Sequence, residues 1–357
     1  MRIVITGATG NVGTALLDAL DPACDVVGLA RRLPDTTAEP YRRAGWRAVD
    51  VGVRGAEQEL TGLFDGADAV VHLAWSISPV RGDPPMWRTN DHGTRHVLAA
   101  AAAAGVPHLV VASSVAAYGP APRWEKVPET HACTGIPHSA YSRGKAALES
   151  LLDRFEERHP EVAVARIRPC AIVHRRAAGE FARWLLDPVV PARIVGGKRL
   201  PVPLWTGLRA QAVHTSDVAE AIGLILERRF AGAVNLAAPE VLDSDALAAV
   251  LGGRRIPVPK PLALVAVRAA WAAGALPVHP GWLELADRAA LADPTLAETA
   301  LGWQPRYDAA SAVAELVAGL RSGEGAASPP LAPPRRGGVV SRLRSLTRVG
   351  PSHQSQA

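Results

Sequence analysis

The chain has 357 residues, 48% of them hydrophobic, and a formal net charge of +5 at pH 7. This length suits two domains or one large α/β domain with an elaborated end, and the apolar content excludes a wholly disordered protein. Cys24, Cys133 and Cys170 match no CxxC or Cys/His spacing. We therefore expect neither disulfides nor a bound metal, and a reducing, cytoplasmic setting suits the chain. No signal peptide or uncharged membrane-spanning run is evident.

Most of the positive charge lies near the C-terminus. Residues 323–357 contain five arginines and one glutamate, which leaves a net charge of only about +1 for the other 322 residues. The Gly, Ser, Pro and Arg composition predicts a disordered basic tail over residues 322–357. Five arginines without interleaved aromatic residues are a weak pattern for nucleic-acid binding, so nucleic acid is not an expected partner.

The first 170 residues alternate β-branched runs with stretches rich in alanine and leucine. Continuous apolar strands that alternate with helices predict a parallel sheet covered on both faces. The expected fold class is therefore α/β, with a Rossmann-type doubly wound parallel sheet. The predicted strands are 2–6, 25–30, 47–50, 69–74, 108–113 and 162–168, and the predicted helices lie near 11–20, 56–63, 89–104 and 140–158.

After residue 170 the alternation becomes looser. Prolines and glycines between 188 and 207 mark a loop-rich segment, and a strand–helix signal over 211–228 precedes a strand at 233–237. Mostly helical sequence then continues to about residue 321. We expect a dinucleotide-binding domain made of residues 1–173 and 211–238, and a smaller, mostly helical substrate-binding domain made of residues 174–210 and 239–321.

A glycine-rich loop follows the first strand and opens the first helix. Its spacing permits a tight turn, a close approach to a pyrophosphate and close helix–strand packing, and the helix N-terminus offers free N–H groups. Glycine turns are also common in ordinary strand–helix connections, but the position within a βαβ unit favours dinucleotide binding. The residues expected to line the cofactor here are Gly7, Thr9, Gly10, Asn11, Val12 and Gly13.

The second strand ends in Arg31 and Arg32, with no acidic residue until Asp35. An acid at this place suits the ribose of NAD, whereas arginine suits the 2′-phosphate of NADP. NADP is therefore the predicted cofactor and NAD the alternative, although both arginines can also be ordinary surface charges. Asp50 and Val51 close the third strand, and they either lie near the adenine or form an exposed strand end.

Tyr141 and Lys145 are four residues apart on a predicted helix and share one face. A lysine cation there would stabilise the phenolate and lower the tyrosine pKa from about 10, as a general acid/base for carbonyl–alcohol interconversion requires. The alternative is a core-edge tyrosine with a snorkelling lysine. Ser114 follows the fifth strand, at the sheet edge where ligands bind, and it either holds a substrate oxygen or caps a turn.

These motifs, in this order, resemble the extended short-chain dehydrogenase/reductase family, also called the NAD-dependent epimerase/dehydratase family, from residue 1 to about 320. The resemblance implies that Ser114, Tyr141 and Lys145 form a catalytic triad and that Lys145 also binds the nicotinamide ribose. It adds Leu73, Ala74 and Pro169 to the cofactor site. The motifs that carry it are TGATGNVG (6–13), HLA (72–74), NDHGT (90–94), SSVAAYG (113–119), YSRGK (141–145), RIRP (166–169), VHTSDVA (213–219) and LGWQP (301–305).

The chain departs from the family pattern in places that concern the substrate. Dehydratases carry Thr-Asp-Glu where this chain has residues 114–116, Ser-Val-Ala, which disfavours dehydration. His174 stands where glycine is more usual, and Cys170 stands where nucleotide-sugar epimerases usually carry asparagine. His214 and Asp217 match a motif interpreted as structural. Candidate substrate walls, with plain packing as the alternative, are Trp75, Trp87, Trp184 and Trp205, and candidate anion anchors are Arg175, Arg176 and Arg183.

The leading hypothesis is an NADP-dependent oxidoreductase that acts on a small-molecule carbonyl or secondary alcohol. Tyr141 would be the general acid/base, and Ser114 would hold the oxygen. The same residues could serve a sugar or sugar-nucleotide epimerase through a transient oxidation. A non-catalytic cofactor-sensing regulator is a second alternative, against which the intact triad argues. A homodimer is compatible with the resemblance.

Overall fold

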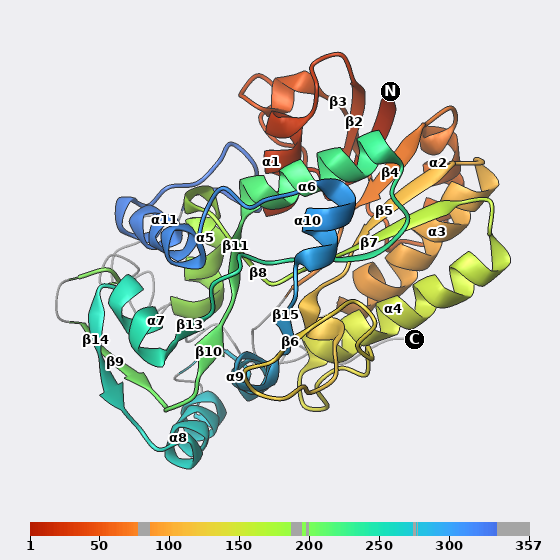
Figure 1. The fold of residues 1–357 in the computed structure, drawn as a ribbon. Helices are drawn as coiled ribbons and strands as arrows, with labels where there is room; N and C mark the ends of the chain where they lie inside the picture. The colour runs from red at the N-terminus through yellow and green to blue at the C-terminus, as the bar shows by residue number, and fades with distance from the viewer. Residues whose placement is uncertain (78–85, 187–194, 198–199, 274–275, 277, 334–357) are drawn as a thin grey trace, which may run out of the picture.

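A computed structural model describes residues 1–77, 86–186, 195–197, 200–273, 276 and 278–333. Its centre is a seven-stranded sheet in the order β12-β7-β5-β4-β1-β2-β3, with all neighbours parallel (Figure 1). The predicted doubly wound α/β fold is confirmed. The strands are β1 Arg2–Thr6, β2 Asp25–Ala30, β3 Gly45–Ala48, β4 Ala69–His72, β5 His108–Ala112, β7 Ala163–Pro169 and β12 Gly232–Leu236.

Helices cover both faces of this sheet. Because side chains alternate along a strand, Ile3 and Ile5 of β1 belong to one buried cluster, shared with α1 and α6, while Val4 belongs to a second cluster shared with α2, α3 and α4. This double burial explains why the strands read as continuous apolar runs. The helices are α1 Asn11–Ala19, α2 Ala56–Phe64, α3 Thr94–Ala103, α4 Ala140–Arg158 and α6 Thr215–Arg228.

The third strand lies two residues earlier than predicted. The sequence placed it at 47–50, whereas β3 is Gly45–Ala48 and pairs Trp46 with Gly28 of β2. Gly28 has no Cβ, and an ideal Cβ there would lie 2.7 Å from the Trp46 ring. The tryptophan therefore fixes the register by packing on the bare backbone of β2.

The second half of the chain contributes short strand pairs and further helices. The pairs are β6 Lys126–Val127 with β15 Leu291–Ala292, β8 Ala171–Val173 with β11 Ala212–His214, β9 Leu200–Leu204 with β14 Gly253–Pro257, and β10 Arg209–Ala210 with β13 Leu242–Asp243. The helices are α5 Ala178–Phe181, α7 Ser244–Val250, α8 Lys260–Ala272, α9 Pro280–Arg288, α10 Thr295–Leu301 and α11 Ala309–Ser322. Figure 1 shows α7 and α8 on the opposite side of the molecule from α2 and α3.

Short helical turns complete the described elements: η1 Tyr41–Arg43, η2 Arg88–Gly93, η3 Val115–Ala117, η4 Arg175–Ala177 and η5 Ala182–Leu186. The turn η2 runs directly into α3, so the predicted helix over 89–104 begins as a wider π-type turn. None of the described helices is both long and apolar enough to span a bilayer.

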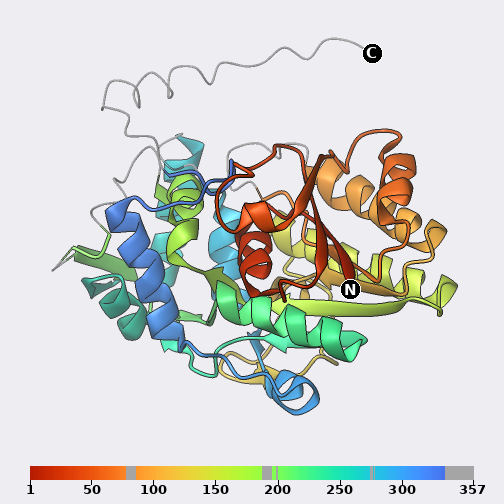
Figure 2. The same cartoon turned by 90° about the horizontal axis from the view of Figure 1, so that it is seen from above.

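Residues 323–333, named here the C-terminal strap, pack against the start of the chain. Ser328 is buried and donates a hydrogen bond of 2.9 Å to the Thr9 carbonyl oxygen. The Asp35 N–H donates to the Ala327 carbonyl oxygen at 2.9 Å, and Leu331 is 1% exposed. The prediction of disorder from residue 322 onward is therefore wrong for residues 322–333, where isolated side chains find partners that local composition does not reveal. Residues 334–357 lie outside the described residues. Figure 2 shows the strap region from above.

Candidate active site

The glycine loop lies between β1 and α1. Gly7 has a φ of +70°, and an ideal Cβ there would lie 2.7 Å from the Ala74 backbone nitrogen. A Cβ on Gly13 would lie 2.7 Å from the Ala8 backbone, while one on Gly10 would meet only the Gly7 carbonyl oxygen, at 3.3 Å. The first and third glycines thus permit close packing, and the second leaves the loop surface open. With the unpaired N–H groups of the first helical turn, the loop fits a dinucleotide pyrophosphate.

The neighbouring strand end is held by a buried histidine. Thr6 Oγ1 lies 2.7 Å from His72 Nδ1, and His72 Nε2 lies 3.1 Å from Thr94 Oγ1. Burial, helped by the nearby Lys145 charge, lowers the pKa of His72 to about 3. The ring is therefore a neutral bridge between the end of β1 and α3. It positions Leu73 and Ala74 beside the glycine loop.

Beyond β2 and β3 lie the residues predicted to contact the adenosine half. Arg31 and Arg32 are exposed at the end of β2. Asp50 is half-buried and forms an ion pair of 2.8 Å with Arg88, and its second oxygen accepts from the Gly52 N–H at 3.0 Å. The carboxylate is therefore already engaged within the protein, and its role toward an adenine stays a prediction, as does that of the buried Val51 next to it.

Ser114 and Tyr141 meet beyond the end of β5. The Ser114 hydroxyl accepts from the Ala116 N–H at 3.1 Å and lies 3.4 Å from the Pro169 carbonyl oxygen. Tyr141, in the first turn of α4, stacks on Trp282 with ring centroids 5.1 Å apart. Burial raises the pKa of Tyr141, although a hydrogen bond with Ser114 opposes this. The expected lowering of this pKa is therefore wrong for the arrangement in the structure, because desolvation of the phenolate outweighs the stabilising contacts.

Lys145 is buried one turn further along α4. Its Nζ donates to the Ala112 carbonyl oxygen at 2.8 Å, lies 3.5 Å from the centre of the Trp75 ring and lies 6.0 Å from that of Tyr141. Burial lowers the pKa of Lys145 to about 7, against the attraction of Glu149. A lysine with this pKa exchanges a proton near neutral pH. The cation contact with Trp75 also gives that tryptophan a place in the site.

Glu149 organises the residues beneath the site, and the sequence interpretation missed it. It is buried, accepts from the Ser113 hydroxyl at 2.5 Å and receives two bonds from Arg168, at 2.8 and 2.9 Å. Burial raises the pKa of Glu149, but the hydrogen bonds and charge of Arg168, together with Ser113 and Arg166, outweigh burial, so the net direction of the pKa shift is down. The available signal was its position four residues after Lys145, since a carboxylate on a buried helical face needs partners.

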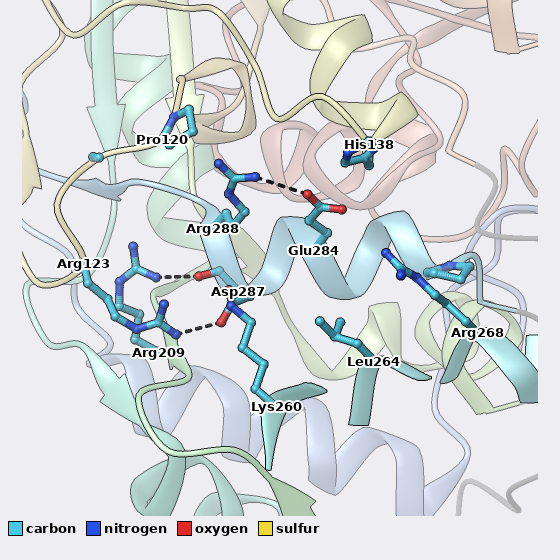
Figure 3. A pocket seen from close by; sticks show the side chains of 12 residues that line it. Pro120, Arg123, His138, Arg209, Lys260, Leu264, Arg268, Glu284, Asp287 and Arg288 are labelled. Atoms are coloured by element: carbon cyan, nitrogen blue, oxygen red, sulfur yellow. Dashed lines mark hydrogen bonds and ion pairs between the residues drawn. The ribbon is translucent and has the colours of Figure 1, made fainter. Parts of the chain in front are cut away.

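A basic cleft is lined by residues of both α8 and α9 (Figure 3). It measures about 470 Å³. The buried carboxylate of Asp287 accepts from Arg123 at 2.7 Å and from Lys260 at 2.5 Å. The charged residues that line the cleft are five basic ones, Arg123, Arg209, Lys260, Arg268 and Arg288, and two acidic ones, Glu284 and Asp287. Cations therefore exceed carboxylates, an excess that favours an anionic ligand.

The substrate residues suggested by the sequence are mostly engaged elsewhere. Trp205 is buried and donates to Asp287 at 2.8 Å, and the exposed Trp87 bonds to His92. Trp184 packs beside Phe181. Each of the three suggested anion anchors binds a protein group: Arg175 binds Glu324, Arg176 binds Asp18, and Arg183 binds the Pro330 and Ala332 carbonyl oxygens.

Comparison with known proteins identifies the family. Residues 3–237 match the model of the NAD-dependent epimerase/dehydratase family, and the chain belongs to that family. An L-arabinose 1-dehydrogenase (NAD(P)(+)) of Haloferax volcanii is 33% identical over 168 residues, which are 44% of this chain and 62% of that protein. An uncharacterised protein of Mycobacterium tuberculosis is 28% identical over 330 residues, which are 90% of this chain and 30% of that protein. The chain thus spans less than two thirds of the length of either relative.

Among solved structures, UDP-glucose 4-epimerase from Thermotoga maritima, crystallised with UDP-glucose, superposes with a TM-score of 0.67 at 20% identity. The match covers 90% of this chain and 99% of the epimerase chain. This likeness shows that the two proteins share a fold.

Proposed function

We propose that this protein is an NADP-dependent oxidoreductase that interconverts a carbonyl and a secondary alcohol. The observation that carries the proposal is the meeting of Ser114, Tyr141 and Lys145 beyond the end of β5, on the sheet edge that also holds the glycine loop. The Haloferax relative, named for a dehydrogenase that uses NAD(P)(+), supports hydride transfer.

The proposed division of labour follows from the geometry. When bound, the nicotinamide supplies or removes the hydride at the substrate carbon. The Ser114 hydroxyl, which hydrogen-bonds to Tyr141, holds the substrate oxygen. Tyr141 gives that oxygen its proton during reduction and takes the proton back during oxidation. Trp282 covers one face of the Tyr141 ring and keeps it oriented.

Lys145 supports the tyrosine electrostatically. Its ammonium form favours the phenolate of Tyr141, which burial alone disfavours. Because the pKa of Lys145 is lowered to about 7, this support is present below about neutral pH and decreases as the pH rises. The bond to the Ala112 carbonyl oxygen holds the amine at the end of β5.

The choice of NADP rests on Arg31 and Arg32. Both are exposed at the end of β2, where a 2′-phosphate would lie next to the adenosine ribose. A charge-assisted hydrogen bond contributes about 1.5–3 kcal/mol, and about 1.4 kcal/mol corresponds to a tenfold change in affinity. One engaged arginine therefore favours NADP over NAD by about ten- to a hundredfold.

The basic cleft on α9 favours a second candidate, a sugar-nucleotide epimerase. Its excess of cations suits a diphosphate. The same Tyr141 and Ser114 would then remove and return a proton within one catalytic cycle. An epimerase retains its cofactor and consumes no net NADP(H), and this difference separates the two candidates.

The test is a screen of the full chain against carbonyls, secondary alcohols and nucleotide sugars, with NADPH, NADP and NAD each supplied. Net oxidation or reduction of the nicotinamide with one substrate class supports the oxidoreductase. Conversion of a nucleotide sugar without net change of the cofactor would establish the epimerase instead. A protein that binds cofactor but turns over no member of the screen would contradict both enzymes and favour a regulator.

A further inference from the structure

A second cluster of reactive side chains lies apart from the triad, where α11 packs against β11 (Figure 1). His174 precedes η4, His214 ends β11 and caps α6, and Glu315 lies within α11. One ring nitrogen of each histidine and one carboxylate oxygen all lie within 4.8 Å of one another. The cluster therefore brings together three side chains, two imidazoles and one carboxylate, of kinds that bind metal ions.

His214 is buried in a way that leaves one nitrogen unused. Its side chain is 3% exposed, and Nε2 has no hydrogen-bond partner among the described residues. The ring stacks on Tyr307 at 3.9 Å between centroids and meets the His174 ring at 4.9 Å, so its orientation is fixed. Nδ1 lies 2.6 Å from the Ser216 hydroxyl. The same Nδ1 also lies 3.3 Å from the Ser216 backbone N–H, which it caps as an acceptor. A metal ion on Nε2 would instead require the proton on Nδ1, where the Ser216 hydroxyl oxygen is placed to accept it.

The nearby positive charges are largely neutralised. Arg175 is held by two bonds to Glu324 of the strap, at 2.7 and 2.8 Å, and Arg176 by Asp18 at 3.1 Å. Glu315 itself makes no hydrogen bond or ion pair within the described part of the chain, so its negative charge is available to the cluster.

We propose that His174, His214 and Glu315 bind a divalent transition metal ion of the Zn²⁺ class. Two imidazoles and one carboxylate suit Zn²⁺, which needs four ligands and accepts water as the fourth. Bonds of about 2.0–2.2 Å place tetrahedral ligands about 3.4 Å apart, so small side-chain rotations close the present spacing. His174 and His214, together with Tyr307, also line a cleft of about 590 Å³.

The site would tie α11 and η4 to the strand β11. The sequence predicted no metal, because it contains no short Cys/His spacing; here the ligands are spread from residue 174 to residue 315. Only the fold brings them together, and His174 occupies a position where the family more usually has glycine.

The test uses the full chain, freed of metal by dialysis against a chelator. Calorimetric titration with Zn²⁺ should show one ion per chain, and Co²⁺ should give the visible absorption of a four-coordinate ion. His174→Ala and Glu315→Gln should each weaken Zn²⁺ binding by more than about a hundredfold, since loss of a mere supporting partner already costs 10–100-fold. His92→Ala, which removes an exposed histidine bonded to Trp87, should bind as the wild type does.

The absence of saturable Zn²⁺ binding would overturn the proposal, as would equal affinities of the wild type and both ligand variants. Glu315→Gln changes little in shape at a half-buried position, and circular dichroism verifies its fold. Because a ligand that binds only the folded state stabilises it, Zn²⁺ should raise the melting temperature of the wild type but not that of Glu315→Gln. An unchanged wild-type melting temperature contradicts the site.

Discussion

The sheet edge around the triad and the basic cleft on α9 are assembled in different ways. At the sheet edge, the glycine loop, Ala74 and Ser114 follow neighbouring parallel strands, so the strand order alone brings them together. In the cleft, Asp287 bonds to Arg123, which lies 164 residues away. Local sequence motifs determine the arrangement at the sheet edge, whereas the arrangement in the cleft depends on the tertiary packing of short elements. The sheet edge is therefore suited to reaction chemistry that a whole family shares, and the cleft is suited to the selection of a particular substrate.

The largest expected effect concerns the sheet edge. Tyr141→Phe should lower the turnover number by about 10²–10⁴-fold, the usual contribution of a general acid/base, and leave cofactor binding intact because only a hydroxyl is removed. Steady-state rates and calorimetric cofactor titration measure both. Tyr41→Phe removes a tyrosine hydroxyl that bonds to Thr14 and not to Ser114, so it is the matched control and should keep its turnover. Near wild-type turnover in Tyr141→Phe would remove Tyr141 from the mechanism.

The next largest expected effect concerns stability, which the buried Glu149 ion pairs near the triad provide. Glu149→Gln removes the charge that compensates the buried Arg168 and part of Arg166, and breaking a buried ion pair costs about 3–5 kcal/mol. Denaturant unfolding measures the loss. Glu156→Gln, which removes a more exposed partner of Arg166, should cost far less. Equal losses would mean that Glu149 holds no special place in the network.

Deletion of the C-terminal strap tests whether local composition or tertiary packing determines that this segment is ordered. From its sequence, deletion of residues 323–357 is expected to leave activity and melting temperature nearly unchanged. The structure predicts otherwise: a chain that ends at residue 322 should lose about 1–3 kcal/mol, because Leu331 burial contributes about 1.5–3 and the Ser328 bond about 0.5–1.5 kcal/mol, offset by the entropy of ordering the strap. A chain that ends at residue 333 keeps these contacts and is the control. Identical melting temperatures for the two chains would show that the strap contributes nothing.

The smallest expected effect concerns cofactor binding at the sheet edge, and it tests the preference for NADP over NAD. Replacing Arg31 and Arg32 together by alanine should weaken NADP binding by about ten- to a hundredfold and NAD binding much less. Added salt should narrow the difference, since both side chains are exposed. Arg47→Ala, on the adjacent strand, is a control that removes an exposed cation of the same type. If the wild type binds NAD as tightly as NADP, the two arginines do not bind the 2′-phosphate of NADP.

Local pattern was enough to predict the sheet, its flanking helices and the family. The residues that sequence reasoning missed share one property, which is that their partners are distant. Trp282 of α9 stacks on Tyr141, and no sequence pattern near either residue predicts this contact. The shift of β3 also depends on a distant partner, since Trp46 fixes the register of β3 by packing on Gly28 of β2. The raised pKa of Tyr141 depends on burial, which a spacing of four residues does not encode.

The hydrogen bond between Ser328 and Thr9 joins residues 319 positions apart. Chains are synthesised from the N-terminus, and domains begin to fold as they emerge from the ribosome. The glycine loop is therefore translated well before the strap that packs on it, because 319 residues separate Thr9 from Ser328. Contacts of such long range close late and slow folding, because loop-closure entropy must be overcome before they form. During synthesis the nascent protein therefore carries a glycine loop that lacks its neighbour until translation has passed Leu331.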